Sequence, residues 1–155
     1  RPMALAPGTA APDFELPDQN GEKVKLSDFQ GKQAVALVFY PFTFTGICEG
    51  ELCQLRDDHS QFTDAGVQVL ALSCDSKNSQ KVWAEQQGYN FPVLSDFWPH
   101  GEVAQAYGVF NDALGCAIRA TFLIGQDGTI VDAFETDSLG TAREADRYTE
   151  ALAKL

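Results

Sequence analysis

The chain has 155 residues, of which 45% are hydrophobic and 21% are charged, as in ordinary globular proteins. This length favours one domain over residues 1–155, large enough for a substantial core. The formal net charge of −11 argues against nucleic acids and anionic membranes as partners, because an acidic surface repels both. No apolar run is long enough to span a bilayer. We expect Arg1 and Pro2 to precede the natural start at Met3, the only methionine.

The cysteine content favours a reducing compartment. The chain contains Cys48, Cys53, Cys74 and Cys116, too few to suggest the disulfide scaffold of a small secreted protein, and no secretory signal pattern is present. We therefore expect a cytoplasmic location. The cysteines and the two histidines are not spaced as zinc ligands, so no metal is expected.

The first part of the chain predicts a hairpin followed by a central strand. Phe14 and Leu16 alternate with acidic residues, a turn signal follows, and alternation then resumes. Residues 13–26 are therefore a predicted β-hairpin. The run AVALVFY at 34–40 is apolar on both faces, as expected for a central strand that is covered by helices.

Helices and strands alternate in the middle of the chain. Residues 47–64 are a predicted helix whose inner side carries Ile47, Leu52, Leu55 and Phe62, and the apolar run 67–73 is a second predicted strand. A second predicted helix follows this strand, with Ser76 as a suitable N-terminal cap and Gly88 at its end. This alternation is typical of the α/β class.

The last part of the chain predicts a short edge strand or loop, a hairpin and a final helix. Residues 91–94 contain a proline and are therefore an edge strand or a loop, and a short helix around 102–107 follows them. A turn signal separates the predicted antiparallel strands 116–124 and 130–135, and the last helix covers 141–154. The elements together predict an α/β fold with a mixed central sheet flanked by helices.

Cys48 lies where the predicted central strand passes into the helix that follows it. The first turn of a helix has unpaired backbone N–H groups and the positive end of the helix dipole, and both favour a thiolate over a thiol. Thr45 lies three residues earlier, so its hydroxyl can reach the sulfur as a donor. Pro41 has no N–H group and fixes the start of the loop. This arrangement is typical of a reactive cysteine.

The pattern Pro41-x-x-x-Thr45-x-x-Cys48 resembles the PxxxTxxC motif of the peroxiredoxins, which are thiol peroxidases of thioredoxin-like fold. The resemblance implies that Cys48 attacks the peroxide O–O bond, that Thr45 orders the reacting oxygens and that Pro41 shields the sulfur. It also implies that Arg119, from a later strand, stabilises the thiolate and the leaving oxygen. Glu51 matches a glutamate of the family's active-site network.

The resemblance covers nearly the whole chain and is strongest to the alkyl hydroperoxide reductase E type. The matching segments are Phe44-Thr45-Gly46-Ile47-Cys48 and Ser95-Asp96-Phe97-Trp98-Pro99-His100-Gly101. It implies a thioredoxin-like fold with an N-terminal β-hairpin. Cys53 departs from this type, because it stands at the spacing at which the bacterioferritin-comigratory (PrxQ) type has its second cysteine.

Whether Cys53 pairs with Cys48 is open from the sequence. Residues five apart in an ideal helix have Cα atoms about 8.7 Å apart, whereas a disulfide needs them within about 7 Å. The two cysteines can therefore bond only if the start of the helix unwinds, which Gly50 makes easier by about 1 kcal/mol. In the alternative, Cys53 is a packed helix residue and an external thiol completes the cycle. Cys116 is a weaker candidate for the second cysteine.

The expected function is reduction of hydrogen peroxide and organic hydroperoxides through a sulfenic acid on Cys48. Cys53 or an external thiol then resolves the sulfenic acid, and a thioredoxin-like, mycoredoxin-like or low-molecular-weight thiol restores the enzyme. No metal, haem, flavin or nucleotide is implied. The resembled family forms dimers through loops beside the active site, which implies a homodimer through the loops that carry Phe44 and Trp98.

Two other functions are compatible with a reactive cysteine. A peroxide-sensing redox relay would use the same cysteine chemistry with low turnover, and peroxide consumption separates it from a peroxidase. A thioredoxin-type disulfide reductase needs a CxxC motif, and the segment Cys48-Glu49-Gly50-Glu51 lacks the second cysteine. The disulfide reductase is therefore disfavoured.

Overall fold

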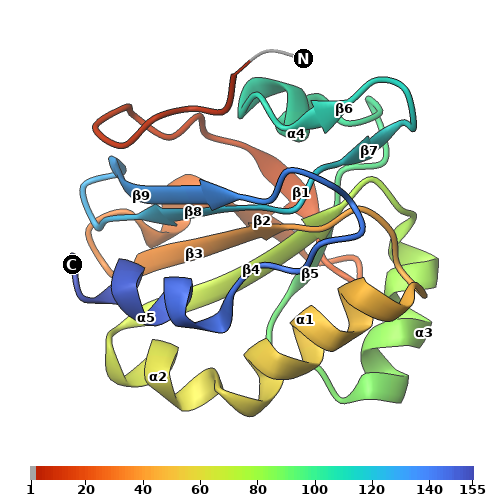
Figure 1. Cartoon of the computed structure of the whole chain (residues 1–155), viewed down its shortest axis with the longest axis horizontal. Helices are drawn as coiled ribbons and strands as arrows, with labels where there is room; N and C mark the ends of the chain where they lie inside the picture. Colours follow the sequence, from red (N-terminus) through yellow and green to blue (C-terminus); the bar gives the residue numbers. More distant parts are fainter. Residues whose placement is uncertain (1–2) are drawn as a thin grey trace.

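A five-stranded mixed sheet forms the centre of the molecule in the computed structural model, which describes residues 3–155 (Figure 1). The strand order is β5-β4-β3-β8-β9; β3, β4 and β5 are parallel, while β8 and β9 run antiparallel to their neighbours. The strands are β3 (Ala34–Phe39), β4 (Val67–Ser73), β5 (Val93–Ser95), β8 (Ala120–Ile124) and β9 (Ile130–Glu135). The predicted mixed sheet is confirmed. The expectation about Arg1 and Pro2 lies outside the described residues.

Helices cover the sheet on both faces. Four helices lie below the sheet in Figure 1 and one short helix lies above it. The four are α1 (Gly46–Asp57), α2 (His59–Asp64), α3 (Lys77–Gln87) and α5 (Ala145–Leu152), and the short one is α4 (Glu102–Ala106). Central strand β3 is buried along its whole length, as its apolar sequence predicts, because both of its faces are covered.

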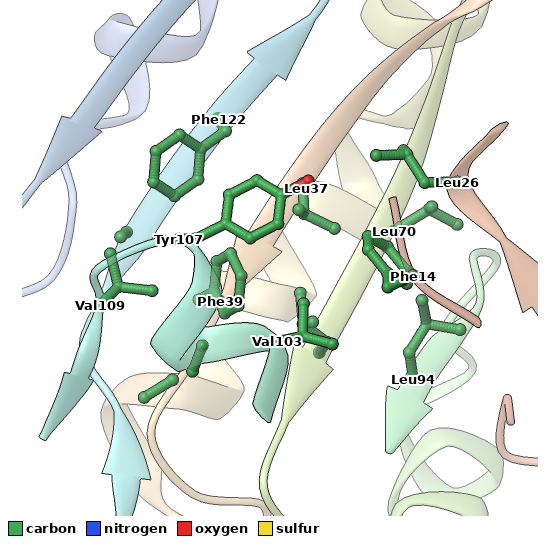
Figure 2. Packing of buried hydrophobic residues seen from close by; sticks show 14 of the residues in the cluster. Phe14, Leu26, Leu37, Phe39, Leu70, Leu94, Val103, Tyr107, Val109 and Phe122 are labelled. Carbon is green, nitrogen blue, oxygen red and sulfur yellow. The ribbon is translucent and has the colours of Figure 1, made fainter. Parts of the chain in front are cut away.

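Large aromatic and aliphatic side chains fill the layer on the α4 side of the sheet (Figure 2). The rings of Phe39, Tyr107 and Phe122 contact one another, with the Tyr107 centroid 5.5 Å from that of Phe39 and 5.1 Å from that of Phe122. The N-terminal segment closes this layer through the hairpin of β1 (Glu15–Pro17) and β2 (Lys23–Lys25) and the short helix η1 (Leu26–Phe29). The predicted N-terminal hairpin is therefore confirmed.

The opposite layer brings α1 and α3 together under the sheet. Leu52 and Leu55 of α1 and Trp83 of α3 are buried there, and the Trp83 ring lies 5.4 Å from that of Tyr40 at the end of β3. Each such side chain stabilises the fold by about 1.5–3 kcal/mol when it is fully buried. Ser76 caps α3 through its hydroxyl and Gly88 ends the helix in the left-handed region, as the sequence predicts.

The predicted helix over 47–64 is divided into α1 and α2. Asp58 separates them with φ −95° and ψ 16°, outside the helical region. Two acidic residues, Asp57 and Asp58, stand at this C-terminal end, where the helix dipole disfavours negative charge. Ile47 was expected on the inner side and is 39% exposed, whereas Phe62 is buried as predicted.

Two further elements differ from the sequence prediction. The predicted strand 116–124 consists of β7 (Cys116–Ala117), which pairs with β6 (Phe110–Asn111), and of β8. The predicted helix 141–154 begins only at Ala145, because the backbone at Glu144 is still extended. Hydrogen bonds that hold Arg143, described below, account for this late start.

Candidate active site

Cys48 is the third residue of α1, beyond the carboxyl end of β3. Strand β3 ends at Phe39, Pro41 begins the connecting loop, and α1 begins at Gly46. The Cys48 side chain is fully buried, at 0% exposure, while Gly46 and Ile47 are exposed. The sequence predicted this placement at the junction of strand and helix, and the helix N-terminus surrounds the sulfur with partial positive charge.

Arg119 provides a full positive charge at the same sulfur. It lies between β7 and β8, is 4% exposed, and its Nη1 donates a hydrogen bond to Cys48 Sγ at 3.1 Å. Its Nε donates to the carbonyl oxygen of Leu139 at 2.9 Å, which fixes the plane of the guanidinium. A charge-assisted hydrogen bond of this kind favours thiolate over thiol. The sequence prediction that Arg119 reaches Cys48 agrees with this contact.

Glu51 lies one turn beyond Cys48 on α1 and accepts from two buried arginines. Arg119 Nη1 lies 2.7 Å and Arg143 Nη2 2.9 Å from its Oε1. Burial alone would raise the pKa of Glu51, but the hydrogen bonds and charge of Arg143 and the charge of Arg119 outweigh it and lower this pKa. Glu51 is therefore an anion that holds both guanidinium groups beside the sulfur.

Arg143 is a residue of the site that sequence reasoning missed. Its backbone N–H and its Nε donate to Glu51 Oε2 at 2.8 Å and 3.0 Å, and its Nη1 donates to the carbonyl oxygens of Phe39 and Ala120. These bonds tie the segment before α5 to the ends of β3 and β8, and they explain why α5 begins late. Local sequence gives no signal for this role, since Arg143 stands in a polar segment that was assigned to the last helix.

Thr45 does not donate to the sulfur as expected. Its hydroxyl donates to the carbonyl oxygen of Phe42 at 2.7 Å, and its side chain makes no cap hydrogen bond to α1 although Thr45 occupies the N-cap position. Phe44, between them, has φ 65°, a left-handed conformation that is strained for a bulky residue. The turn at Phe44 directs the Thr45 hydroxyl back along the loop, so its oxygen keeps lone pairs that can accept from a ligand.

Polar contacts anchor the loop between Pro41 and Thr45 to the end of β4. The backbone N–H of Thr43 donates to Asp75 Oδ2 at 2.8 Å, and the hydroxyl of Ser73 donates to the same oxygen at 2.7 Å. The Thr43 hydroxyl lies 2.9 Å from the buried hydroxyl of Tyr40. Sequence reasoning did not identify these anchors.

Comparison with known proteins places the chain in a family. Residues 7–133 match the AhpC/TSA family. The chain belongs to this family of peroxiredoxins. It is 49% identical over 148 residues to alkyl hydroperoxide reductase E of Mycobacterium tuberculosis, covering 96% of both chains. It is 39% identical over 137 residues to peroxiredoxin Bcp of Escherichia coli, covering 84% of this chain and 86% of the other.

Structural comparison agrees with this assignment. The crystal structure of peroxidoxin BcpB from Mycobacterium tuberculosis is 32% identical, has a TM-score of 0.85, and covers 97% of this chain and 96% of the other. The protein is thus a peroxiredoxin of the alkyl hydroperoxide reductase E type with a thioredoxin-like fold. Its reaction is the thiol-dependent reduction of a hydroperoxide.

Cys53 of this peroxiredoxin faces α3 from the second turn of α1. It is half-buried, and its Sγ lies 3.5 Å from Gln87 Oε1 and 3.9 Å from the hydroxyl of Tyr89. Helix α1 is continuous from Gly46 to Asp57, and both Cys48 and Cys53 are free thiols. The intact helix and the unpaired cysteines agree with the distance argument made from sequence.

The two other cysteines are poor nucleophiles at neutral pH. Burial, and secondarily the negative charge of Asp96, raises the pKa of the Cys74 thiol to about 12. Burial raises the pKa of the Cys116 thiol to about 11. The side chains of both are buried. A resolving role for Cys116 is therefore disfavoured, since the thiolate is the attacking species.

Across residues 3–155, no three or more His, Cys, Asp or Glu side chains are grouped as metal ligands. Within the same residues, no helix has the length and apolar character needed to cross a bilayer.

Proposed function

We propose that Cys48 is the cysteine that attacks the hydroperoxide in this peroxiredoxin. The observation that carries the proposal is the 3.1 Å hydrogen bond from Arg119 Nη1 to Cys48 Sγ at the start of α1. The thiolate attacks one peroxide oxygen, the O–O bond breaks, and the other oxygen leaves as an alcohol or water after it takes up a proton. Cys48 is left as a sulfenic acid.

The neighbouring residues position and polarise the peroxide in this proposal. Arg119 stabilises both the thiolate and the oxygen that becomes negative as the O–O bond breaks. Thr45 already donates its proton to Phe42, so its oxygen accepts the hydrogen bond of the peroxide O–H group. Glu51 holds Arg119 in place, and Pro41 excludes water from the sulfur, since it is buried and has no N–H group to hydrate.

Two variants test this assignment. Cys48→Ser should abolish peroxide consumption and keep the folded state, as judged by circular dichroism. Arg119→Ala should slow the oxidation of Cys48 by about 10²–10³-fold, the cost of losing one donor to developing negative charge. Peroxide consumption by Cys48→Ser at the wild-type rate would remove Cys48 from this role.

We further propose that Cys53 or an external thiol resolves the sulfenic acid. Cys53 is a candidate for this role because its half-buried thiol lies on the same helix as Cys48. The distance between the two residues requires the first turns of α1 to open before the two sulfurs bond. Mass spectrometry after one equivalent of peroxide separates the routes. A Cys48–Cys53 disulfide supports the internal route, whereas free Cys53 beside oxidised Cys48 supports an external thiol.

The partners follow from this cycle. The family reaction needs a hydroperoxide and a thiol reductant, and we propose a thioredoxin-like, mycoredoxin-like or low-molecular-weight thiol as the reductant. We also propose one peroxiredoxin domain, a homodimer through the loops of Phe44 and Trp98, and a cytoplasmic location, where such reductants are kept reduced. The rate of peroxide reduction in the presence of each class of reductant identifies the one that regenerates the enzyme.

A further inference from the structure

Gln87, the last residue of α3, connects two positions of α1 that lie on either side of Gly50. Its Nε2 donates to Glu49 Oε1 at 3.0 Å, and its Oε1 accepts from Cys53 Sγ at 3.5 Å. One half-buried amide therefore bridges the residue after Cys48 and the candidate resolving cysteine.

The chemistry of the groups fixes the direction of both hydrogen bonds. A carboxylate only accepts, so the amide nitrogen of Gln87 must face Glu49. The amide oxygen then faces Cys53, and it can be satisfied there only by a protonated thiol. The arrangement seen in the structure is thus specific to the thiol form of Cys53.

Few other side chains hold the first turn of α1 closed. Gly46, Ile47 and Gly50 are exposed, and a Cβ added to either glycine would meet nothing within 4 Å. Within this turn the side chains of Cys48, which accepts from Arg119, and of Glu49 are bonded to the rest of the molecule, while Glu51 in the next turn is held by Arg119 and Arg143. The side chain of Glu49 accepts from two residues of α3, Gln87 Nε2 at 3.0 Å and Trp83 Nε1 at 3.3 Å.

We propose that Gln87 is a latch that keeps the first turn of α1 closed while Cys53 is a thiol and releases it when Cys53 ionises. A thiolate cannot donate to Gln87 Oε1 and repels it, so the amide rotates and turns Nε2 toward the sulfur. Glu49 then loses this donor. The hydroxyl of Tyr89 and the guanidinium of Arg56 also face Cys53 and are the other groups that respond to its charge.

The latch rests on the proposal that Cys53 resolves the sulfenic acid, and it sets the order of that step. Cys53 first loses its proton to solvent, and the turn opens. The Cys53 thiolate then attacks the sulfur of the Cys48 sulfenic acid, forming the S–S bond and breaking the S–O bond. Hydroxide leaves and is protonated to water. The helix opens only when an attacking thiolate is ready.

The first test is Gln87→Ala, with Gln86→Ala as the matched control. Gln86 is the same residue type at the adjacent, exposed position of α3. The Gln87 variant should form the Cys48–Cys53 disulfide about fivefold to tenfold faster after sulfenic acid formation, the effect of one lost hydrogen bond on an opening equilibrium. Amide exchange of residues 47–52 in the reduced protein should increase by a similar factor. The control should match wild type in both measurements.

The second test probes the coupling to Cys53. Serine can donate to Gln87 Oε1 but does not ionise in the physiological range, so Cys53→Ser should keep the turn closed as pH rises. Wild type should show an additional increase of exchange at residues 47–52 over Cys53→Ser at the same pH, as its thiol ionises. Glu49→Gln keeps an acceptor for Gln87 and should remain close to wild type, whereas Glu49→Ala should resemble Gln87→Ala.

The outcomes separate the latch from the function on which it rests. If wild type forms no Cys48–Cys53 disulfide, internal resolution is wrong and the latch falls with it. If the disulfide forms but Gln87→Ala and Gln86→Ala behave alike in disulfide formation and exchange, internal resolution stands and the latch alone is overturned. Equal exchange in wild type and Cys53→Ser at every pH would also overturn it.

Discussion

At the scale of single residues, the buried charges of the candidate active site compensate one another. Arg119 and Arg143 bring two positive charges, and Glu51 brings one negative charge, so the cluster is neutral only when Cys48 is a thiolate. Buried charges are stable when they are paired and hydrogen-bonded, and costly otherwise. The network therefore supports the ionised sulfur through its total charge as well as through the one direct contact from Arg119.

This balance makes Arg143 the most informative residue to change. Arg143→Ala should lower the free energy of unfolding by about 3–5 kcal/mol, because it leaves a buried carboxylate with half of its partners, and should slow Cys48 oxidation. Arg143→Lys should be intermediate in both, since an ammonium keeps the charge but cannot reproduce the forked contacts. Urea unfolding and the rate of peroxide consumption measure the two effects.

Arg147 provides the control for Arg143. It lies on α5, where it pairs with Asp132 and Glu150 while its own side chain is 29% exposed. Asp132 also pairs with Lys154 and so keeps a cationic partner when Arg147 is lost, and ion pairs that reach the surface contribute about 0–1 kcal/mol. Arg147→Ala should therefore change unfolding little and leave the oxidation rate as it is. Equal effects of the two alanine variants would show that Arg143 has no special place in the site.

The position of Cys48 at the start of a helix was predictable from sequence and the position of Arg143 was not, for a physical reason. Pro41, Thr45 and Cys48 lie within eight residues, so their spacing alone shows a loop that leads into a helix N-terminus. Arg143 instead meets Glu51 across 92 positions of the chain, and only the packed fold brings the two together. Arg119 was found only because the family resemblance points to a later strand.

At the scale of elements, the loop before α1 is held in a strained shape by the end of β4. A bulky residue in the left-handed region costs about 1–3 kcal/mol, and Phe44 adopts it at φ 65°. The hydrogen bond from Thr43 N to Asp75 and the hydroxyl contact between Thr43 and Tyr40 offset this cost. The orientation of Thr45 toward Phe42 depends on this turn.

Asp75 should therefore affect catalysis without touching the sulfur. Asp75→Ala removes the acceptor for Thr43 and should lower the second-order rate with peroxide by about tenfold, the equivalent of a hydrogen bond of about 1.4 kcal/mol. Asp75→Asn keeps an oxygen that accepts from both Thr43 and Ser73, so its rate should recover most of the loss. Stopped-flow measurement of Cys48 oxidation in both variants gives these rates. Equal rates for the alanine and asparagine variants would contradict the role of Asp75 as the anchor of the loop.

Helix α4 is held by a carboxylate that is costly to ionise. Asp96 is 2% exposed and accepts from the backbone N–H groups of Val103 and Ala104 at 3.1 Å and 2.9 Å. Burial, together with the charge of Glu102, raises the pKa of Asp96 from 3.8 to about 6, although these two hydrogen bonds and the charge of His100 act in the opposite direction. The folded protein therefore binds this proton more tightly than the unfolded chain does.

A raised carboxyl pKa makes the contribution of Asp96 to stability decrease as pH rises from about 4 to about 6. The difference between about 6 and 3.8 corresponds to about 3 kcal/mol. The Asp96→Asn side chain cannot ionise, so the variant's free energy of unfolding should increase relative to that of wild type by up to that amount between pH 4 and pH 7. Loss of one acceptor adds an offset that does not depend on pH. If the free energies of unfolding of wild type and Asp96→Asn change in parallel with pH, the raised pKa of Asp96 is contradicted.

The elements that were misjudged from sequence are those whose ends are set by distant contacts. The strand and hairpin patterns gave β3, β4 and β9 because burial on the sheet acts directly on the period of apolar residues. The late start of α5 at Ala145 depends instead on Glu51, which holds the backbone of Arg143 outside the helix. No local pattern carries that information.

At the scale of the whole molecule, the functional parts gather at one edge of the sheet. Parallel strands β3, β4 and β5 end there, and they are followed by the loop to Cys48, by Asp75 and by Asp96. The carboxyl ends of parallel strands are the usual place for sites in open α/β sheets. The same edge carries exposed aromatic side chains, with Phe44 53% and Trp98 80% exposed.

These aromatic side chains predict a homodimer at that edge. In a symmetric dimer each contact occurs twice, and a buried tryptophan at an interface contributes about 2 kcal/mol or more. Trp98→Ser should therefore weaken the dimer about a thousandfold, which converts a dimer at tens of micromolar protein into a monomer.

Leu155 is also 50% exposed, but it ends the chain at the other end of the sheet (Figure 1), so Leu155→Ser should leave the dimer intact. Sedimentation velocity on wild type and both variants measures the result, and a wild-type protein that sediments only as a monomer in this concentration range would contradict the prediction.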